Sequence, residues 1–93
     1  MNRYAILRRD GWAHQEELSQ AATRSSSVVE EEMPDDVHWI RSYVLDEGGG
    51  AVGTVCIFEA TSVAALRLHA TAARLPVTEI IPLIETVVIR PDP

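Results

Sequence analysis

The feature that most constrains the fold is the stretch from Val37 to Ala60, in which two runs of β-branched and aromatic residues flank a glycine-rich turn. Such runs favour β-strands, and the segment from Glu47 to Gly50 is typical of a hairpin loop. If that loop has four residues, antiparallel counting pairs His38 with Glu59 and places successive side chains on alternate faces. The stretch therefore predicts a β-hairpin with a defined register.

The two faces of this hairpin differ in chemistry. The face that we expect under helices is mainly aliphatic and comprises Ile40, Val44, Val55 and Ile57, with His38 and Glu59 at its open end. The other face carries the predicted pairs Trp39 with Phe58, Arg41 with Cys56, and Tyr43 with Thr54. Aromatic rings beside a guanidinium and a thiol are unusual on a surface that only meets water. We therefore expect Trp39, Arg41, Tyr43 and Phe58 to line an interface or a pocket.

The rest of the chain supplies two more strands and two helices. Alternation predicts a strand over Asn2–Arg9 that a turn at Asp10–Gly11 ends, and helical spacing predicts a helix from about His14 to Glu31. Ser62 is a candidate N-cap for a second helix that ends before Pro76, and the last strand is expected over Leu83–Ile89. The order is βαββαβ, which predicts an α+β, ferredoxin-like fold with two helices on one face of a four-stranded antiparallel sheet.

Composition limits the classes of partner. The 93 residues suit a single ferredoxin-like domain over 1–93, and the net charge of −6 argues against binding to nucleic acid or to an anionic membrane. With one cysteine the chain forms no internal disulfide, and no apolar run is long enough to span a bilayer. We expect a cytoplasmic protein that pairs as a homodimer through its open sheet face.

Four short motifs occur in a fixed order. They are Trp39 followed by Ser42, Tyr43 and Val44, then Cys56 followed by Glu59 and Ala60, then His69 with Ala70, and then Leu75 with Pro76. This pattern, which extends from Tyr4 to about Ile80, resembles a small bacterial ferredoxin-like family that was long labelled a domain of unknown function. The resemblance implies a dimeric nickel-binding protein, since a member has been described as one. The chain departs from the family pattern at Leu68, where an acidic residue is expected, and at Arg74, where glycine is expected.

Nickel favours imidazole and thiolate ligands, with carboxylates assisting. We expect His69, His38 and Glu59 to converge on the metal, because parity puts all three between the helices and the hairpin. His69 is the favoured ligand of this trio, and Cys56 is a possible additional donor from the opposite face. The alternative for His69 is a buried histidine that a hydroxyl or a carbonyl satisfies, and the alternative for Cys56 is a small buried apolar residue.

Three functions follow from these residues. The first is sequestration or handling of nickel without catalysis. The second is a small dimeric α+β enzyme, similar to ferredoxin-like monooxygenases, with an aromatic pocket lined by Trp39, Tyr43 and Phe58. The third is a dimerisation module without a ligand. Hydrolase and phosphoryl-transfer activities have no support, because no Ser/His/Asp arrangement and no glycine-rich phosphate loop occurs.

Overall fold

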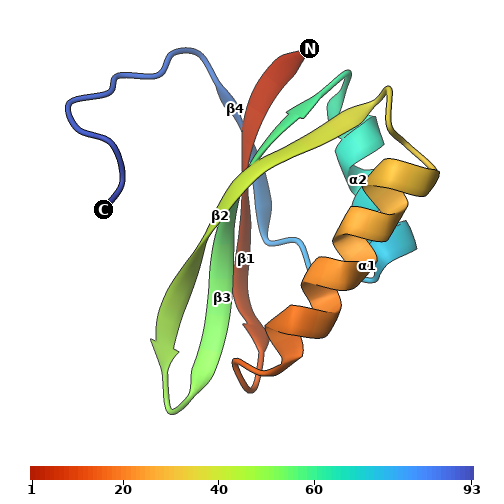
Figure 1. Ribbon diagram of the computed structural model, residues 1–93. Coiled ribbons are helices and arrows are strands. Elements are labelled where there is room, and N and C mark those ends of the chain that lie inside the picture. Colours follow the sequence, from red (N-terminus) through yellow and green to blue (C-terminus); the bar gives the residue numbers. More distant parts are fainter.

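The computed structural model describes residues 1–93 and has two layers, a four-stranded sheet and a pair of helices. The elements are β1 (Asn2–Trp12), α1 (Glu17–Glu31), β2 (Val37–Gly48), β3 (Ala51–Ala60), α2 (Val63–Ala73) and β4 (Glu79–Leu83). The strands form an antiparallel sheet of order β2-β3-β1-β4, and both helices lie against the same face (Figure 1). This arrangement confirms the predicted ferredoxin-like fold. Neither helix is long and apolar enough to cross a membrane.

The core lies between the two helices and the covered face of the sheet. Alternate residues of β1 point inward, so Tyr4, Ile6 and Arg8 are all buried. Phe58 on β3 and Leu66 on α2 are 1% and 0% exposed and meet in the same cluster. Each such side chain contributes about 1.5–3 kcal/mol by leaving water, so this cluster is the main source of stability.

The predicted assignment of faces was wrong for the aromatic pair. Trp39 and Phe58 stack with their ring centroids 6.1 Å apart, and both pack into the core under the helices. The aliphatic residues Ile40 and Ile57, expected there, lie instead on the open face, and Ile40 is 46% exposed. The larger rings bury more apolar area, so the face that carries them gains more from being covered.

A β-bulge at Ile40 explains why the rest of the predicted register also shifts. The predicted pairs His38 with Glu59 and Trp39 with Phe58 are present, but the next pair joins Arg41 to Ile57 instead of Cys56. Without the bulge, Arg41 and Tyr43 would share the covered face with Trp39. The extra residue reverses the alternation after Ile40, so Arg41 and Tyr43 are on the open face, as expected. Cys56, Thr54 and Val44 are on the covered face, and Val55 is on the open face.

The hairpin loop is shorter than predicted. Gly48 pairs with Ala51, so only Gly49 and Gly50 form the loop, and both have positive φ angles of 63° and 87°. Two-residue hairpin turns of this kind need left-handed backbone, which glycine adopts without a steric penalty.

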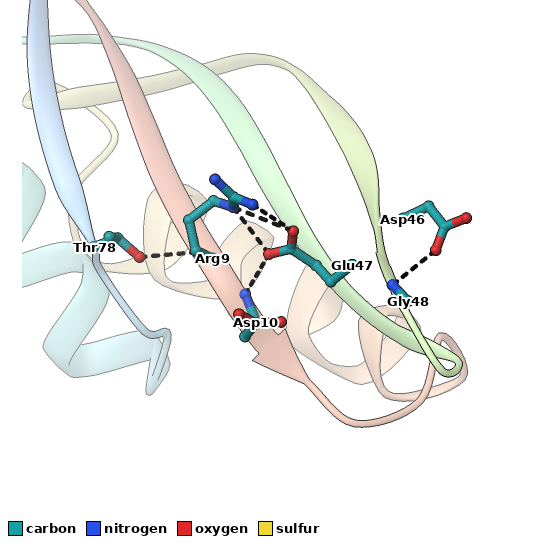
Figure 2. A network of polar contacts seen from close by, with 6 residues as sticks. All are labelled: Arg9, Asp10, Asp46, Glu47, Gly48 and Thr78. Atoms are coloured by element: carbon teal, nitrogen blue, oxygen red, sulfur yellow. Dashed lines mark hydrogen bonds and ion pairs between the residues drawn. The ribbon is translucent and has the colours of Figure 1, made fainter.

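The first strand does not end at Asp10–Gly11 but continues through a bulge to Trp12. Glu47 of β2 reaches across β3 and accepts hydrogen bonds from the Asp10 N–H at 2.6 Å and from the Arg9 guanidinium at 2.8–3.2 Å (Figure 2). Gly53 makes this possible, since a Cβ there would lie 2.5 Å from the Arg8 carbonyl oxygen and 2.8 Å from the Glu47 carboxylate. The chain therefore stays in the sheet where the local sequence predicts a turn.

Both helices begin and end near the residues that the sequence predicts. The Ser62 hydroxyl caps α2 by accepting a hydrogen bond from the Ala65 N–H at 3.1 Å. Arg74 ends the same helix with a left-handed backbone, at φ 58° and ψ 50°, which is the position where the family pattern has glycine. The first helix begins at Glu17, slightly later than predicted.

The last strand is earlier in the chain than predicted. It covers Glu79–Leu83 and pairs with β1 from Leu7 to Arg3. Since β1 begins at Asn2, the residues from 84 onward extend beyond its end and have no strand to pair with. They form instead a tail whose Asp92 accepts hydrogen bonds from Arg41 and Tyr43 on the open face.

Candidate functional site

The open face carries the imidazole and carboxylate pair that was predicted to be adjacent. His38 on β2 and Glu59 on β3 are cross-strand partners, and His38 Nδ1 lies 3.8 Å from Glu59 Oε1. Their side chains are 51% and 38% exposed, so water and ions reach them. Because Trp39 and Phe58 occupy the covered face, strand alternation places this pair on the opposite side of the sheet from the helices.

His69 lies on the covered side instead. It is fully buried in α2, its ring rests 5.2 Å from the ring of Phe58, and its Nε2 is 3.2 Å from the hydroxyl of Ser25 on α1. Burial lowers the pKa of His69, while the contact with the Ser25 backbone opposes that shift and the nearby positive charge of Arg8 adds to it. His69 is therefore a neutral ring that joins the two helices to the sheet.

The expected convergence of His38, Glu59 and His69 is not formed, because the sheet separates the pair from His69. No three His, Cys, Asp or Glu side chains gather anywhere in the molecule. Cys56 is buried under the helices, where its thiol donates to Thr54 Oγ1 at 3.3 Å. From that side it cannot meet a second copy across the open face.

A cavity of about 120 Å³ lies between α1 and the covered face of the sheet. Most of its lining is apolar or aromatic, with three hydroxyl groups and one guanidinium. The lining residues are Arg8, Trp12, Leu18, Ala21, Ala22, Ser25, Trp39, Ser42, Val44, Thr54, Cys56, Phe58 and Leu75. Two of the predicted pocket residues, Trp39 and Phe58, thus line this cavity, whereas Arg41 and Tyr43 line a separate groove on the open face.

Arg8 is a buried charged residue of this cavity that reasoning from the sequence did not select as a candidate. It is 1% exposed, its Nη1 donates to the Pro76 carbonyl at 2.7 Å, and its Nη2 is buried with no hydrogen-bond partner. It forms no ion pair, and the cavity that it lines contains no carboxylate. Its alternation with Tyr4 and Ile6 was visible in the sequence and was the signal that an arginine shared the inward face.

The open face also forms a groove beneath the C-terminal tail. Arg41 and Tyr43 hold Asp92 at 2.9 and 2.6 Å, and these contacts raise the pKa of Arg41 and lower that of Asp92, with the Tyr43 hydrogen bond as the largest cause of each shift. The tail thereby closes a groove of about 590 Å³, which Glu59 and Glu85 also line. Asp92 of the same chain thus supplies the carboxylate that pairs with Arg41.

Comparison with known proteins agrees with this architecture. The family model described as "Nickel responsive protein SCO4226-like" matches residues 4–83. The chain belongs to this family. The resemblance inferred from the Trp39 to Pro76 motifs is therefore confirmed.

One solved relative of similar fold is the crystal structure of SCO4226 from Streptomyces coelicolor A3(2). It has a TM-score of 0.71 and 20% sequence identity, and the match covers 91% of this chain and 99% of that chain. At that identity the likeness establishes the fold that the SCO4226-like family shares. No protein of curated function matches the sequence.

Proposed function

We propose that this protein binds Ni²⁺ on its open sheet face, through His38 and Glu59, and handles the ion without catalysing a reaction. The observation that carries the proposal is the match of residues 4–83 to a family described as nickel-responsive. The His38 and Glu59 pair supports it, since imidazole and carboxylate are donors that suit first-row divalent metals. The net charge of −6 favours the approach of cations.

The spacing of the pair is compatible with one shared ion. Two donors that each bind a metal at about 2.1 Å can be at most about 4.2 Å apart, and His38 Nδ1 and Glu59 Oε1 are 3.8 Å apart. A single chain does not supply a complete set of ligands, however, because no third His, Cys, Asp or Glu side chain lies beside the pair. The pair is a half-site, and water or a second copy of the chain supplies the remaining ligands.

A homodimer through the open face fits this half-site. A two-fold axis that passes beside the pair would bring His38 and Glu59 of both protomers together and so double the number of donors. The face carries exposed apolar residues that such contact would cover, among them Ile40 at 46% and Tyr43 at 43% exposure. Trp39 and Phe58, once expected there, are under the helices and take no part. A reducing compartment suits the unpaired Cys56, so we place this role in the cytoplasm.

Calorimetric titration of tag-free, metal-free protein with Ni²⁺ tests the assignment. We expect saturable binding that His38→Gln and Glu59→Gln each weaken by tenfold or more, because each removes one of two donors. His14→Gln is the matched control, since His14 is an exposed histidine outside the pair. His69→Gln should also retain binding, because that ring is buried on the other side of the sheet.

The outcome that contradicts the site is wild-type nickel affinity in both His38→Gln and Glu59→Gln. Loss of binding in His69→Gln alone, with the fold intact, would restore the assignment made from the sequence. Light scattering with and without Ni²⁺ tests the dimer separately. A monomer mass at micromolar concentration under both conditions would exclude the second copy as a source of ligands.

A further inference from the structure

We propose that the cavity between α1 and the sheet is a binding site for a small organic monoanion that carries one carboxylate on an apolar body no larger than a single aromatic ring. The site is independent of the proposed nickel pair, which lies on the other face of the sheet. The argument begins with Arg8, the charged side chain that the fold buries without a counter-ion.

A buried charge is normally paired, because removing a lone ion from water is costly. Arg8 remains charged in any protein environment, yet its one polar contact is the Pro76 carbonyl, which Nη1 reaches at 2.7 Å. Nη2 is buried and without a partner, and no Asp or Glu lines the cavity. A carboxylate that enters the cavity provides the missing acceptor and the missing negative charge together.

Two hydroxyl groups in the cavity have a proton to donate to such an anion. Thr54 is the cross-strand partner of Arg8, and its Oγ1 already accepts from the Cys56 thiol, which leaves its own O–H free. Ser42 Oγ likewise accepts from the Trp39 indole N–H at 2.8 Å. The polar groups of the cavity are thus arranged as donors, and an acceptor-rich ligand suits them.

The apolar residues of the cavity favour a ligand whose uncharged part is small and apolar. The volume of about 120 Å³ is close to that of the ~150 Å³ apolar cavities that admit a benzene ring. Trp39 and Phe58 present stacked aromatic rings to this space. Val44 lines the cavity and is 52% exposed, so the cavity reaches the surface beside β2. Inorganic anions would leave most of these apolar walls without contact.

Titration with sodium benzoate at constant ionic strength tests the proposal, with benzamide as the uncharged analogue of the same shape. The protein has two tryptophans, Trp12 and Trp39, and both line the cavity, so their fluorescence reports its occupancy. We expect a saturable change with benzoate and binding at least about tenfold weaker with benzamide, since the charge-assisted hydrogen bonds are lost. Equal binding of the two compounds, or no binding of either, would overturn the proposal. An equal response to sodium phosphate would overturn the requirement for an apolar body.

Variants locate the site. Arg8→Met keeps the length of the side chain without its charge and should weaken benzoate binding more than about tenfold, whereas Arg67→Met, on the exposed surface of α2, should leave it unchanged. Ala22→Leu is a second variant, because Ala22 lines the cavity and a larger side chain fills the space while Arg8 is kept. Retained benzoate affinity in a folded Arg8→Met or Ala22→Leu variant would show that the anion binds elsewhere.

Discussion

The covered and open faces of the sheet are built from the same strands, yet they are held by different interactions. On the covered face Phe58 and Leu66 are 1% and 0% exposed and belong to a continuous apolar cluster. On the open face side-chain pairs link the strands to one another and to the C-terminal tail: Arg9 with Glu47, His38 with Glu59, and Arg41 with Asp92. Packing stabilises the first face, whereas the exposed pairs of His38 with Glu59 and Arg41 with Asp92 contribute little.

This difference also separates the two kinds of chemistry that the molecule offers. Exposed donors on the open face can exchange ions with solvent, which suits a metal that is acquired and released. The covered face has few polar side chains, and among them Arg8 and His69 each keep one buried nitrogen without a hydrogen-bond partner. A ligand that carries one negative charge on a small apolar body is what we propose for the cavity on that face.

The sharpest contrast is between two neighbours in β3. Phe58→Ala should lower the free energy of unfolding by about 3–5 kcal/mol, because it opens a space in the core. Ile57→Ala, on the open face, should cost about 1 kcal/mol, within the range of strand preferences at half-buried positions. Urea denaturation of both variants measures the difference. Equal losses would mean that the two faces contribute alike and that the contrast drawn here is false.

The open face has one position where packing does matter. Gly53→Ala should destabilise the protein by about 1–3 kcal/mol, since the new Cβ meets the Arg8 carbonyl and the Glu47 carboxylate. The same change should release the Asp10 N–H and the Arg9 side chain from Glu47 (Figure 2). Thermal unfolding measures the loss. Gly49→Asn is the control, because a Cβ added at Gly49 meets no other atom within 4 Å and asparagine tolerates its positive φ. A Gly53→Ala variant as stable as wild type would remove the steric argument.

The pH dependence of stability tests the burial of His69. Its pKa is lowered in the folded state, so below the unfolded value of about 6.5 the unfolded chain binds more protons than the folded one. The free energy of unfolding should therefore fall as the pH drops from 7 towards 5. His69→Gln should be less stable at pH 7 by about 1–3 kcal/mol, through the disturbed contact with Ser25, and should lose less on acidification.

The exposed His14 provides the control for this profile. His14→Gln should keep the wild-type slope, because the His14 side chain is exposed and lies outside the buried contact of His69 with Ser25. If His69→Gln loses stability between pH 7 and pH 5 as steeply as wild type, the buried ring is not the group that titrates.

Periodicity in the sequence was enough to predict the order of the elements, because each helix and strand has its own apolar repeat. The Ser62 cap was also predictable, since it depends on local backbone chemistry, whereas the left-handed backbone of Arg74 is found at a position where glycine was expected. The pairing of His38 with Glu59 was predicted correctly, but only because the shorter loop is offset by two irregularities of β2, one between Asp46 and Gly48 and one at Ile40. The order of the elements and the helix cap, by contrast, need only neighbours in the chain.

The errors came from contacts between distant segments. The bulge at Ile40 carries no glycine or proline to mark it, and it changed which face the later residues of β2 occupy. The continuation of β1 past Asp10 depends on Glu47 and Gly53, which are far away in sequence. The cavity depends on how α1 sits over the sheet, so no local pattern indicated that Arg8 would lie beside it unpaired.

The most direct test of the two-face account is an NMR titration of isotopically labelled, tag-free protein with Ni²⁺, following the ring signals of His14, His38 and His69. The unpaired electrons of Ni²⁺ broaden the signals of nuclei close to the ion. We predict that the ring signals of His38 broaden first, at substoichiometric nickel, while those of the buried His69 persist. Early broadening of His69 with an unaffected His38 would contradict the assignment of the metal to the open face.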